Sequence, residues 1–546
     1  MRPCLGCLAL GALVGCSDAP RLQSPRDAAV TPSDLGEDVY SVHIAQHPGP
    51  RACDEAASRG EGRGCAFVAT SLLHHGLGQM VDGQRPDDFH FAVAVANPWD
   101  DPVTVTVEGL GETVTETLAP RRVSTLARRW FEPAARVYDP APPADVQAAD
   151  GVVRLTASAP VSAWQLSPWR AERPDEACAG RLPEACLAGS AEASRLVPVH
   201  QLGTRYVALT LPTQRVLSAG ETAWRVAAGA VTIVALGGGA TVRLSGSGES
   251  TAALRGPSPR AVRSLGPFEI LSLVSSQSEG CAREVEVRQS GGRFCVPLRS
   301  EDLSGTVIES DRPVAVFAGH ACAQVPFDRY ACDHVEEQLP PVAAWGTEHV
   351  VARAVPLASG ASGAPAEGPP TYLRVIADAD TTLSFEPAGS NPAQRIAAHE
   401  PFEMSFRAPF VLRSQSPVMV ASFRAGSAWW PASGAAPLGE LGDPWMVIET
   451  PRAQWRRQYV VTVPEATRTA WATVIGTSPP VVDDRPFALA PAATLGDLSV
   501  WNIPLSQGFH EIRGPHRMGL RLDALGRYVG YGVSGEGDLN LGGSPE

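Results

Sequence analysis

The chain contains no lysine, and all 45 of its basic residues are arginine. Against 58 acidic residues this gives a formal net charge of −13, and no basic run interrupts the sequence. Nucleic-acid binding requires a clustered basic face, so we set that class of function aside. Long hydrophobic runs are also missing. After the first fifteen residues no apolar stretch approaches the ~18 residues of a membrane-spanning helix.

Sequence motifs of hydrolytic catalysis are absent as well. The chain has no G-x-S-x-G nucleophile elbow and no H-E-x-x-H motif. Two glycine-rich stretches, at residues 237–239 and 245–248, fall at expected hairpin tips, whereas a phosphate-binding loop must open a helix. We therefore predict that the protein is not an enzyme. Glycoside hydrolysis stays an alternative, because it needs only two facing carboxylates among 58 acidic residues.

The first sixteen residues have the pattern of an export signal. Arg2 provides a positive start, and residues 5–15 are apolar or small, a stretch too short to span a bilayer as a helix. Its end, Leu13-Val14-Gly15-Cys16, resembles the lipobox of bacterial lipoproteins. The resemblance implies cleavage before Cys16 and acylation of its thiol and new amino terminus, which anchors a protein stably in a membrane. The alternative is an ordinary secretory signal with an unrelated cysteine.

The residue after the lipobox refines the expected location. In bacterial lipoproteins an aspartate at this position favours retention at the inner membrane, and this chain has Ser17 there. We therefore expect a protein held in the outer membrane by its lipid, with the folded part exposed at the cell surface. The lipid is the only membrane contact that the sequence supports.

Cysteine usage agrees with export. Apart from Cys4, Cys7 and Cys16, eight cysteines remain, and they lie in four sequence-local couples. An even number of close pairs predicts disulfides formed in an oxidising compartment. The expected pairs are Cys53 with Cys65, Cys178 with Cys186, Cys281 with Cys295, and Cys322 with Cys332.

The strand pattern predicts an all-β fold of several units. A chain of 546 residues exceeds what a single core holds. From residue 65 to residue 533, short apolar stretches alternate with period two, separated by Gly, Pro, Asp and Ser, and helical periodicity is nearly absent. Residues 16–50, with several prolines among polar residues, have instead the composition of a tether.

The strands recur in a fixed order. An aromatic or β-branched strand that closes on proline occurs at residues 203–212, 346–356 and 457–464, and the first unit lacks a clear copy of it. A hairpin and a further strand follow in each unit. The unit then ends with a strand, a polar turn and a strand that opens on proline, as at Pro160, Pro313 and Pro417. We predict about four antiparallel β units that pack together, either propeller-like or as tandem β-sandwiches.

These observations divide the chain into six segments. A signal peptide at residues 1–15 and a lipidated tether at 16–50 precede four β units at 51–195, 196–340, 341–440 and 441–546. The second unit includes a disulfide-stapled loop.

Residues 305–350 carry the most specific motif of the chain. They combine a strand ending in S-D-R-P-V-A-V-F, a G-H pair, two cysteines, C-D-H-x-E-E-Q and W-G-T. This run resembles the family of the N-terminal region of animal IgGFc-binding protein, which bacterial surface lipoproteins share, with weaker resemblance over residues 65–430. The resemblance implies an extracellular β-rich module of the binding or adhesive kind. It transfers no ligand-contact residue and no antibody binding.

The same region gathers the densest group of candidate metal ligands. Thiolates and imidazoles could hold zinc, and the carboxylates could hold calcium. Exported thiols ten residues apart oxidise, however, and a disulfide offers no thiolate. We therefore expect no metal and no cofactor, and we interpret the group as a stapled loop whose acids and histidines orient backbone turns. The group consists of His320, Cys322, Cys332, Asp333, His334, Glu336 and Glu337.

Twelve tryptophans leave a further hint of a binding surface. Aromatic side chains in loops favour partner contact, but large apolar side chains more often close a core, which is the interpretation that we prefer. The tryptophans near strand ends are Trp164, Trp169, Trp429, Trp430, Trp445 and Trp455.

The sequence therefore predicts a lipid-anchored binding or adhesion protein of the cell envelope that performs no catalysis. The expected partner is an extracellular or envelope protein or a glycan. Two rival functions are a structural envelope component and a polysaccharide hydrolase.

Overall fold

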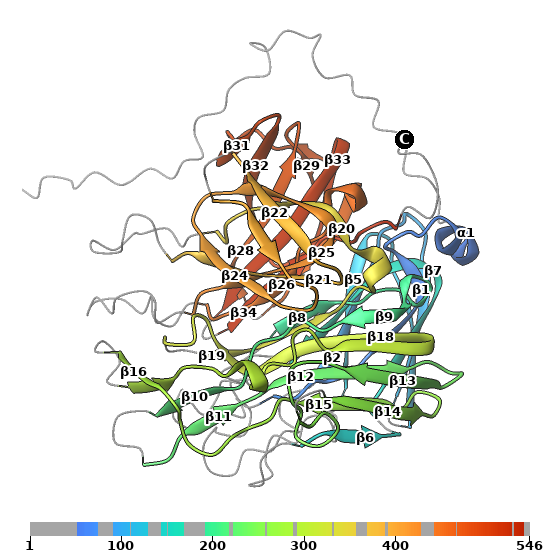
Figure 1. The fold of residues 1–546 in the computed structure, drawn as a ribbon. Helices are drawn as coiled ribbons and strands as arrows, with labels where there is room; N and C mark the ends of the chain where they lie inside the picture. The colour runs from blue at the N-terminus through green and yellow to red at the C-terminus, as the bar shows by residue number, and fades with distance from the viewer. Residues whose placement is uncertain are drawn as a thin grey trace, which may run out of the picture. The chain divides into compact units, whose positions relative to one another are not determined.

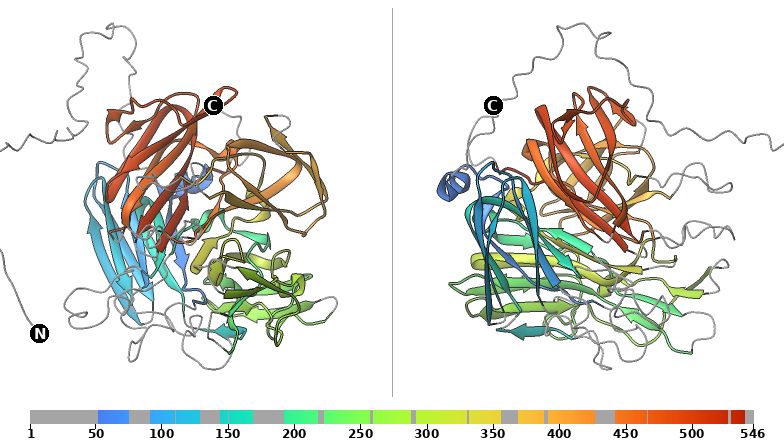
Figure 2. Two further views of the ribbon diagram at one scale, coloured as in Figure 1. Left: turned by 90° about the vertical axis from the view of Figure 1, so that its left-hand side faces the viewer. Right: turned by 180° about the vertical axis from the view of Figure 1, so that it is seen from behind.

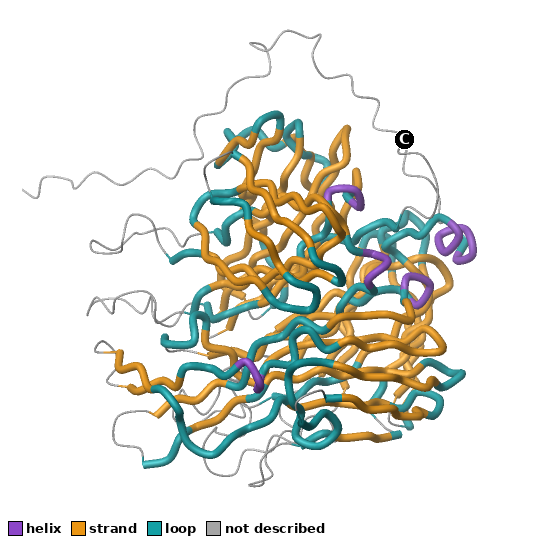
Figure 3. Tube along the Cα trace, in the orientation of Figure 1, coloured by secondary structure: helices purple, strands orange, loops and turns teal. Residues whose placement is uncertain are grey.

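Strands dominate the computed structural model, and helices are few and short (Figure 3). In the described residues the helices are α1 (Cys53–Ser58) and the 3₁₀ turns η4 (Val199–Gln201), η5 (Arg299–Glu301), η6 (Val342–Ala344) and η9 (Arg452–Gln454). None of the helices in the described residues is long and apolar enough to cross a membrane. The predicted all-β class is confirmed. The structure describes residues 52–74, 91–109, 111–128, 144–149, 151–168, 192–217, 222–256, 259–287, 292–329, 332–355, 369–387, 391–426, 442–465, 467–526 and 529–539.

Four units repeat one topology around a long strand (Figure 1). The long strand pairs through its first half with an opening strand and with the second strand of a hairpin. Through its second half it pairs with the first hairpin strand and with a closing strand. The long strands are β7 (Val153–Ser167), β18 (Val307–Gln324), β25 (Phe410–Arg424) and β33 (Gly508–Gly526).

The other strands of each unit follow in the same order. The first unit has β1 (Gly64–Ala69), β2 (Phe91–Asn97), β3 (Val103–Gly109), β4 (Glu112–Leu118), β5 (Arg122–Arg128) and β8 (Glu192–Arg195). The second has β9 (Gly203–Val207), β12 (Gly229–Ala235), β13 (Ala240–Ser245), β14 (Arg260–Leu265), β15 (Ile270–Val274) and β19 (Cys332–Gln338). The third has β20 (Gly346–Val351), β21 (Thr371–Ala377), β22 (Thr381–Glu386), β23 (Gln394–Ile396), β24 (Phe402–Phe406) and β26 (Met446–Ile448). The fourth has β27 (Arg456–Val463), β28 (Thr467–Gly476), β29 (Val481–Val482), β30 (Arg485–Pro486), β31 (Ala493–Leu495), β32 (Leu498–Leu505) and β34 (Val529–Ser534).

Each unit is a small sandwich whose two half-sheets share the long strand. In the third unit, for example, β20 and β22 pair with residues 410–414, whereas β21 and β26 pair with residues 418–424. Alternate residues of both half-sheets point inward and form one core of buried aliphatic and aromatic side chains, as period-two alternation requires.

The middle of each long strand differs from the prediction. The sequence indicated two strands separated by a polar turn, but the strand assignment runs unbroken through Pro160, Pro313, Pro417 and Pro515. The pairing with the opening strand becomes irregular in this part of each unit. A proline lacks the N–H of a regular ladder, so it is tolerated where the strand bends from one half-sheet to the other.

The opening strand of the first unit is present as β1, which pairs with β7 as β9 pairs with β18. The first unit therefore has an opening strand, although it lacks a clear copy of the sequence motif, as expected. The sequence of β1, Gly-Cys-Ala-Phe-Val-Ala, has no closing proline and only one aromatic residue. The strand could therefore not be recognised by the sequence motif of the other units.

The four units pack against one another in a closed succession (Figure 2). Their closing strands meet, because β8 contacts β19 and β34, and β26 contacts the same two strands. Shared apolar clusters join each unit to the next, and a further cluster joins β2, β7 and β8 of the first unit to β27, β28, β33 and β34 of the fourth. The units are thus sandwiches individually and propeller-like in their arrangement.

A glycine and a proline mark three junctions between units. The opening strands begin with Gly64, Gly203 and Gly346, and each glycine packs on the proline that precedes the next unit. A Cβ at Gly203, for example, would lie 2.6 Å from the Cβ of Pro341. The junctions therefore require glycine for close approach rather than for an unusual φ.

Three of the predicted cysteine pairs are disulfides in the structure: Cys53–Cys65, Cys281–Cys295 and Cys322–Cys332. The predicted pair of Cys178 and Cys186 lies outside the described residues, and so do Cys16, the signal peptide and the tether at 16–50. The boundaries of the predicted segments stay predictions.

Candidate functional site

The predicted polar group lies on paired strands, not in a loop. His320 and Cys322 belong to β18, and the other five members belong to β19, which pairs with β18. Every residue of β19 after Cys332 is buried. The interpretation of a stapled loop whose acids orient turns is therefore wrong for these side chains, because β19 is the closing strand of the second unit and packs between neighbouring closing strands.

The ligands proposed for zinc do not converge. Cys322 and Cys332 are oxidised to a disulfide and offer no thiolate. The ring of His320 contacts the carbonyl oxygen of Pro212 through Nε2 at 3.1 Å and the amide of Cys322 through Nδ1 at 3.2 Å. Within the described residues, no three His, Cys, Asp or Glu side chains are arranged to hold a metal ion.

Hydrogen bonds tie the buried side chains of β19 to the first unit. His334 Nε2 lies 3.0 Å from Glu336 Oε2, and Gln165 Nε2 of β7 donates to Glu336 Oε1 at 2.8 Å. The ring of His74 stacks on that of His334 with centroids 4.5 Å apart. Ser194 of β8 donates its hydroxyl to Glu337 at 3.3 Å. This network joins two units.

Carboxylates accumulate where the closing strands meet. Glu192 of β8 accepts the backbone N–H of Met446 and of Gly532, which belong to the third and fourth units. Burial raises the pKa of Glu192 well above its usual value, and these backbone donors only partly offset the effect. Burial also raises the pKa of Glu337, with Arg195 opposing it. We assign this centre a structural role, because backbone and side-chain groups of all four units converge on it.

An open cavity of about 550 Å³ lies between the second and third units. We call it the inter-unit groove. One side is the face of β21 and β24, where Tyr372 is paired with Ser405 and Arg374 with Glu403. The other side consists of loops of the second unit, which contribute Pro212, Pro297, Leu298, Pro326 and Phe327.

A buried ion pair fixes the floor of the groove. Arg374 Nη2 lies 2.7 Å from Asp302 Oδ2 and 2.8 Å from Glu403 Oε1. Arg374 Nη1 donates to the hydroxyl of Ser304 at 3.0 Å. Although burial alone would raise the pKa of Asp302, the guanidinium of Arg374 and the donors of Ser304 hold it below its usual value. The floor of the groove is therefore formed by two charged side chains that neutralise each other and hold each other in place.

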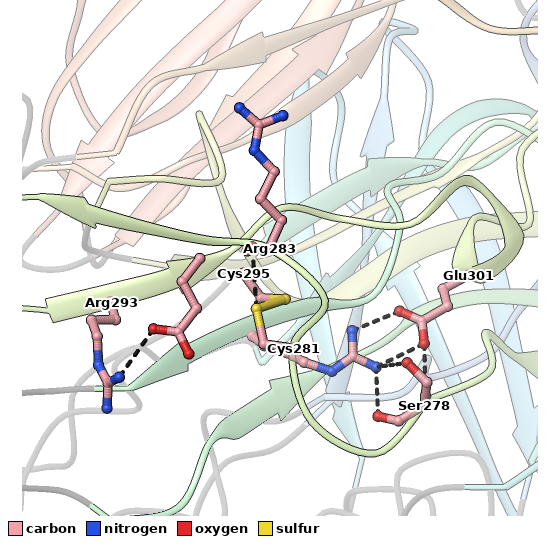
Figure 4. Close-up of a disulfide and its surroundings, with 8 residues drawn as sticks. Ser278, Cys281, Arg283, Arg293, Cys295 and Glu301 are labelled. Carbon is pink, nitrogen blue, oxygen red and sulfur yellow. Dashed lines mark hydrogen bonds and ion pairs between the residues drawn. A yellow bond between two sulfur atoms is a disulfide. The ribbon is translucent and has the colours of Figure 1, made fainter.

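The loop wall of the groove is also held in place (Figure 4). The Cys281–Cys295 disulfide links the loop that follows β15 to β17 (Gly292–Cys295), just before Pro297. Arg215 donates to both carboxylate oxygens of Glu301 at 2.6 and 2.7 Å, and the amide of Ser278 donates to the same carboxylate at 2.6 Å. Both partners of this ion pair are 2% exposed, so the wall is set before any ligand binds.

One constellation has the residue types of a hydrolase triad. His510 Nδ1 lies 2.7 Å from Asp483 Oδ2, and its Nε2 lies 3.3 Å from the hydroxyl of Ser506. The same Nε2 is nearer, at 2.8 Å, to the carbonyl oxygen of Ser506. The closer contact of Nε2 is thus with a carbonyl oxygen, which can only accept, so Nε2 is poorly placed to take a proton from the Ser506 hydroxyl.

Of the six tryptophans predicted near strand ends, those that can be placed close the core. Trp164, Trp445 and Trp455 are at most 3% exposed, as we expected. Trp169, Trp429 and Trp430 lie outside the described residues.

Sequence reasoning did not find the inter-unit groove. Its two sides come from segments that lie far apart in the sequence, such as those of Pro212 and Tyr372, and no local pattern pairs them. The one available signal was the long connection between β15 and β18, because the corresponding connection of the third unit, from β24 to β25, is only residues 407–409.

Fold and groove together define a class of all-β proteins in which small sandwiches pack around a common centre and leave a preformed groove between two of them. The chain belongs to the IgGFc binding protein family, whose model matches residues 192–522. Human IgGFc-binding protein is 29% identical over 275 residues, which cover 50% of this chain and 4% of that protein. No solved structure matches the chain.

Proposed function

We propose that this chain is a binding protein of the cell envelope, held in the outer membrane by acyl chains on Cys16, and that the inter-unit groove takes its ligand. The observation that carries the proposal is the groove itself, whose two sides are fixed by the Arg374–Asp302 and Arg215–Glu301 pairs. Preorganised, partly apolar clefts with a few polar groups are the usual form of binding sites. Both sides lie within the region that the family model matches.

Binding without turnover fits the chemistry of the groove. Asp302, buried on its floor, is neutralised by Arg374, and Glu400 at the rim pairs with Arg299 at 3.2 Å. The lowered pKa of Asp302 makes this carboxyl a poor general acid. The groove therefore offers a ligand a fixed cleft lined by the aromatic rings of Phe327 and Tyr372, with the Arg374–Asp302 ion pair on its floor.

Binding is tested with the full chain against three immobilised probes: the Fc fragment of human IgG, a glycan array and a library of linear peptides. The Fc fragment is included because the human relative is named for binding it. Phe327→Ala combined with Tyr372→Ala removes aromatic surface from the groove, and we expect at least a tenfold loss of affinity, ~1.4 kcal/mol. Val262→Ala, on an exposed side chain of β14, is the matched control. Absence of binding to every probe would end the proposal.

The anchor is tested separately. Cys16→Ala should move the protein from the membrane fraction to the soluble fraction, and added protease should digest the wild-type protein on intact cells. Protection from protease would favour a structural component on the inner face. Release of reducing ends from polysaccharide would establish the hydrolase instead.

A further inference from the structure

The second unit carries a strand that comes from the first. β6 (Val146–Ala148) lies in the connection between β5 and β7, yet it pairs with β15 of the second unit (Figure 1). Asp145, just before β6, fixes it in place: its carboxylate accepts from the amides of Ala253 and Val274 at 2.7 and 2.8 Å. One unit thus completes the sheet of its neighbour by strand addition.

The equivalent strand of the third unit is β24. β15 and β24 both pair with the first hairpin strand of their unit, and on that alignment Val274 corresponds to Ser405. Among the described residues, no strand pairs with the outer edge of β24. In the fourth unit the corresponding strand, β32, is covered by β31.

The backbone of β24 offers hydrogen-bonding groups along this edge. In β15, the N–H of Val274 donates outward to Asp145, and its carbonyl oxygen accepts outward from the amide of Thr251 at 2.9 Å. The same alternation directs the N–H and C=O of Glu403 and Ser405 away from β21. No interaction of these backbone groups is recorded within the described residues.

Within the described residues, the connection that could have covered this edge does not pair with it. In the first unit the connection before the long strand supplies β6. In the second unit the corresponding connection, residues 275–306, folds instead into β16 (Glu284–Val287) and β17, which pair with each other. Its residues Pro297, Leu298 and Arg299 form a wall of the groove. The groove thus lies beside β24, in the position that corresponds to the place of β6 beside β15 in the second unit.

We propose that the inter-unit groove accepts an extended segment of a partner polypeptide, which adds to the outer edge of β24 as β6 adds to β15. The inference rests on the proposed binding function and names the class of ligand. Backbone hydrogen bonds to Glu403 and Ser405 hold the segment, and its groove-facing side chains contact Phe327, Pro212 and Tyr372. An alternation of apolar and polar residues in the ligand follows from the period of a strand.

The test begins with selection of linear peptides, about ten residues long, on the immobilised full chain. Binding of a selected peptide should slow hydrogen exchange at the amides of Glu403 and Ser405 at least about tenfold, and should leave the amides of β14, an edge strand remote from the groove, unchanged. N-methylation of the peptide at one set of alternate positions should abolish binding, whereas N-methylation at the other set should leave it intact.

A pair of variants tests the same edge from the protein side. Ser405→Pro removes one outward N–H, which an edge strand tolerates, and should weaken peptide binding at least about tenfold. Ser405→Ala keeps the N–H and should lose much less affinity than Ser405→Pro. Val262→Ala, on an exposed side chain of β14 outside the groove, should bind like the wild type. If Ser405→Pro does not fold, the N-methylated peptides decide the question alone.

The outcomes separate the two proposals. Peptides that protect amides outside β24, or that bind equally well in every N-methylated form, would overturn strand addition and leave the binding function standing. Binding of glycans in the groove without peptides would do the same. Failure of peptides, glycans and the Fc fragment alike would remove the binding function, and strand addition with it.

Discussion

Arg374 of the third unit and Asp302 of the second form an ion pair of 2.7 Å in which neither side chain is more than 4% exposed. The pair crosses the boundary between the two units, and its residues are 72 positions apart in the sequence. It lies at the floor of the inter-unit groove and also contacts Glu403 of β24. The stability of the junction and the shape of the groove therefore depend on the same side chains.

Asp302→Asn should destabilise the protein by about 3 kcal/mol, because it leaves the buried guanidinium of Arg374 without a counter-charge from the second unit. The free energy of unfolding in urea measures this loss. Glu55→Gln, in the exposed pair of Glu55 with Arg59, should cost no more than about 0.5 kcal/mol. Similar losses in both variants would contradict the buried ion pair.

The buried carboxylates at the centre make stability depend on pH. Burial raises the pKa of Glu192 and Glu337 in the folded state, so their contribution to stability is present below their unfolded pKa of about 4.3 and is lost as pH rises through the folded value. Asp302 has a lowered pKa, so its contribution is present above about pH 4 and is lost as pH falls through its folded value.

Glu192 and Glu337 should therefore make the melting temperature rise as pH is lowered toward about 4.3, and the melting temperature should fall in stronger acid. The buried His349, whose pKa burial lowers to about 3, opposes this rise below about pH 6.5. In Glu337→Gln the rise should be smaller, since one of the groups that titrate at the centre is gone. Asp311→Asn is the control for this pH interval, because Asp311 is exposed and its lowered pKa, which arises mainly from the amide of Thr241, acts only in stronger acid. An unchanged slope in Glu337→Gln would contradict the raised pKa.

Removal of a disulfide should act on binding only where it supports the groove. Cys281→Ser with Cys295→Ser should lower stability by about 2–3 kcal/mol and weaken ligand binding, because the groove wall loses its staple. Cys53→Ser with Cys65→Ser should cost a similar amount, but it lies in the first unit and should leave affinity unchanged. Equal effects of both pairs on affinity would show that the staple does not shape the groove.

Even substitution by alanine at a junction glycine should lower stability. Gly203→Ala places a Cβ 2.6 Å from the Cβ of Pro341, and we expect a loss of about 1–3 kcal/mol from overpacking. Gly266→Ala, where the nearest atom is a carboxylate oxygen at 3.4 Å, should change stability by less than about 1 kcal/mol. Differential scanning calorimetry of the two variants checks the difference. Equal melting temperatures would mean that the junction yields without cost.

Local features of the fold could be predicted from the sequence. Period-two alternation indicates strands because it reflects which residues of one strand face a core. The pairing of Cys281 with Cys295 was predictable because their strand and loop are neighbours in sequence. The repeat of opening strand, hairpin and proline-containing strand indicated four units for the same reason, since each unit is built from consecutive segments.

Features that depend on two or more units could not be predicted. The sequence around Pro313 predicts a turn. The pairing of β18 with β9 before the proline and with β12 after it shows that the strand continues through a bend, and this pairing is not visible in the sequence. β6 contributes to a neighbouring unit, which no local pattern encodes. Asp333, His334 and Glu336 suggested ligands, yet their neighbours, such as Gly530 and Gln165, lie more than 150 residues away in sequence.

The sequence by itself determined the all-β class, the repeated units, the family and the sequence-local disulfides, because these follow from side-chain alternation and from residues that are close along the chain. Only the tertiary structure decided that the acids and the histidine of β19 are buried at the centre, and that a groove opens beside β24. The physical reason is that burial and pairing arise between units, where each side chain meets partners that its own segment does not contain.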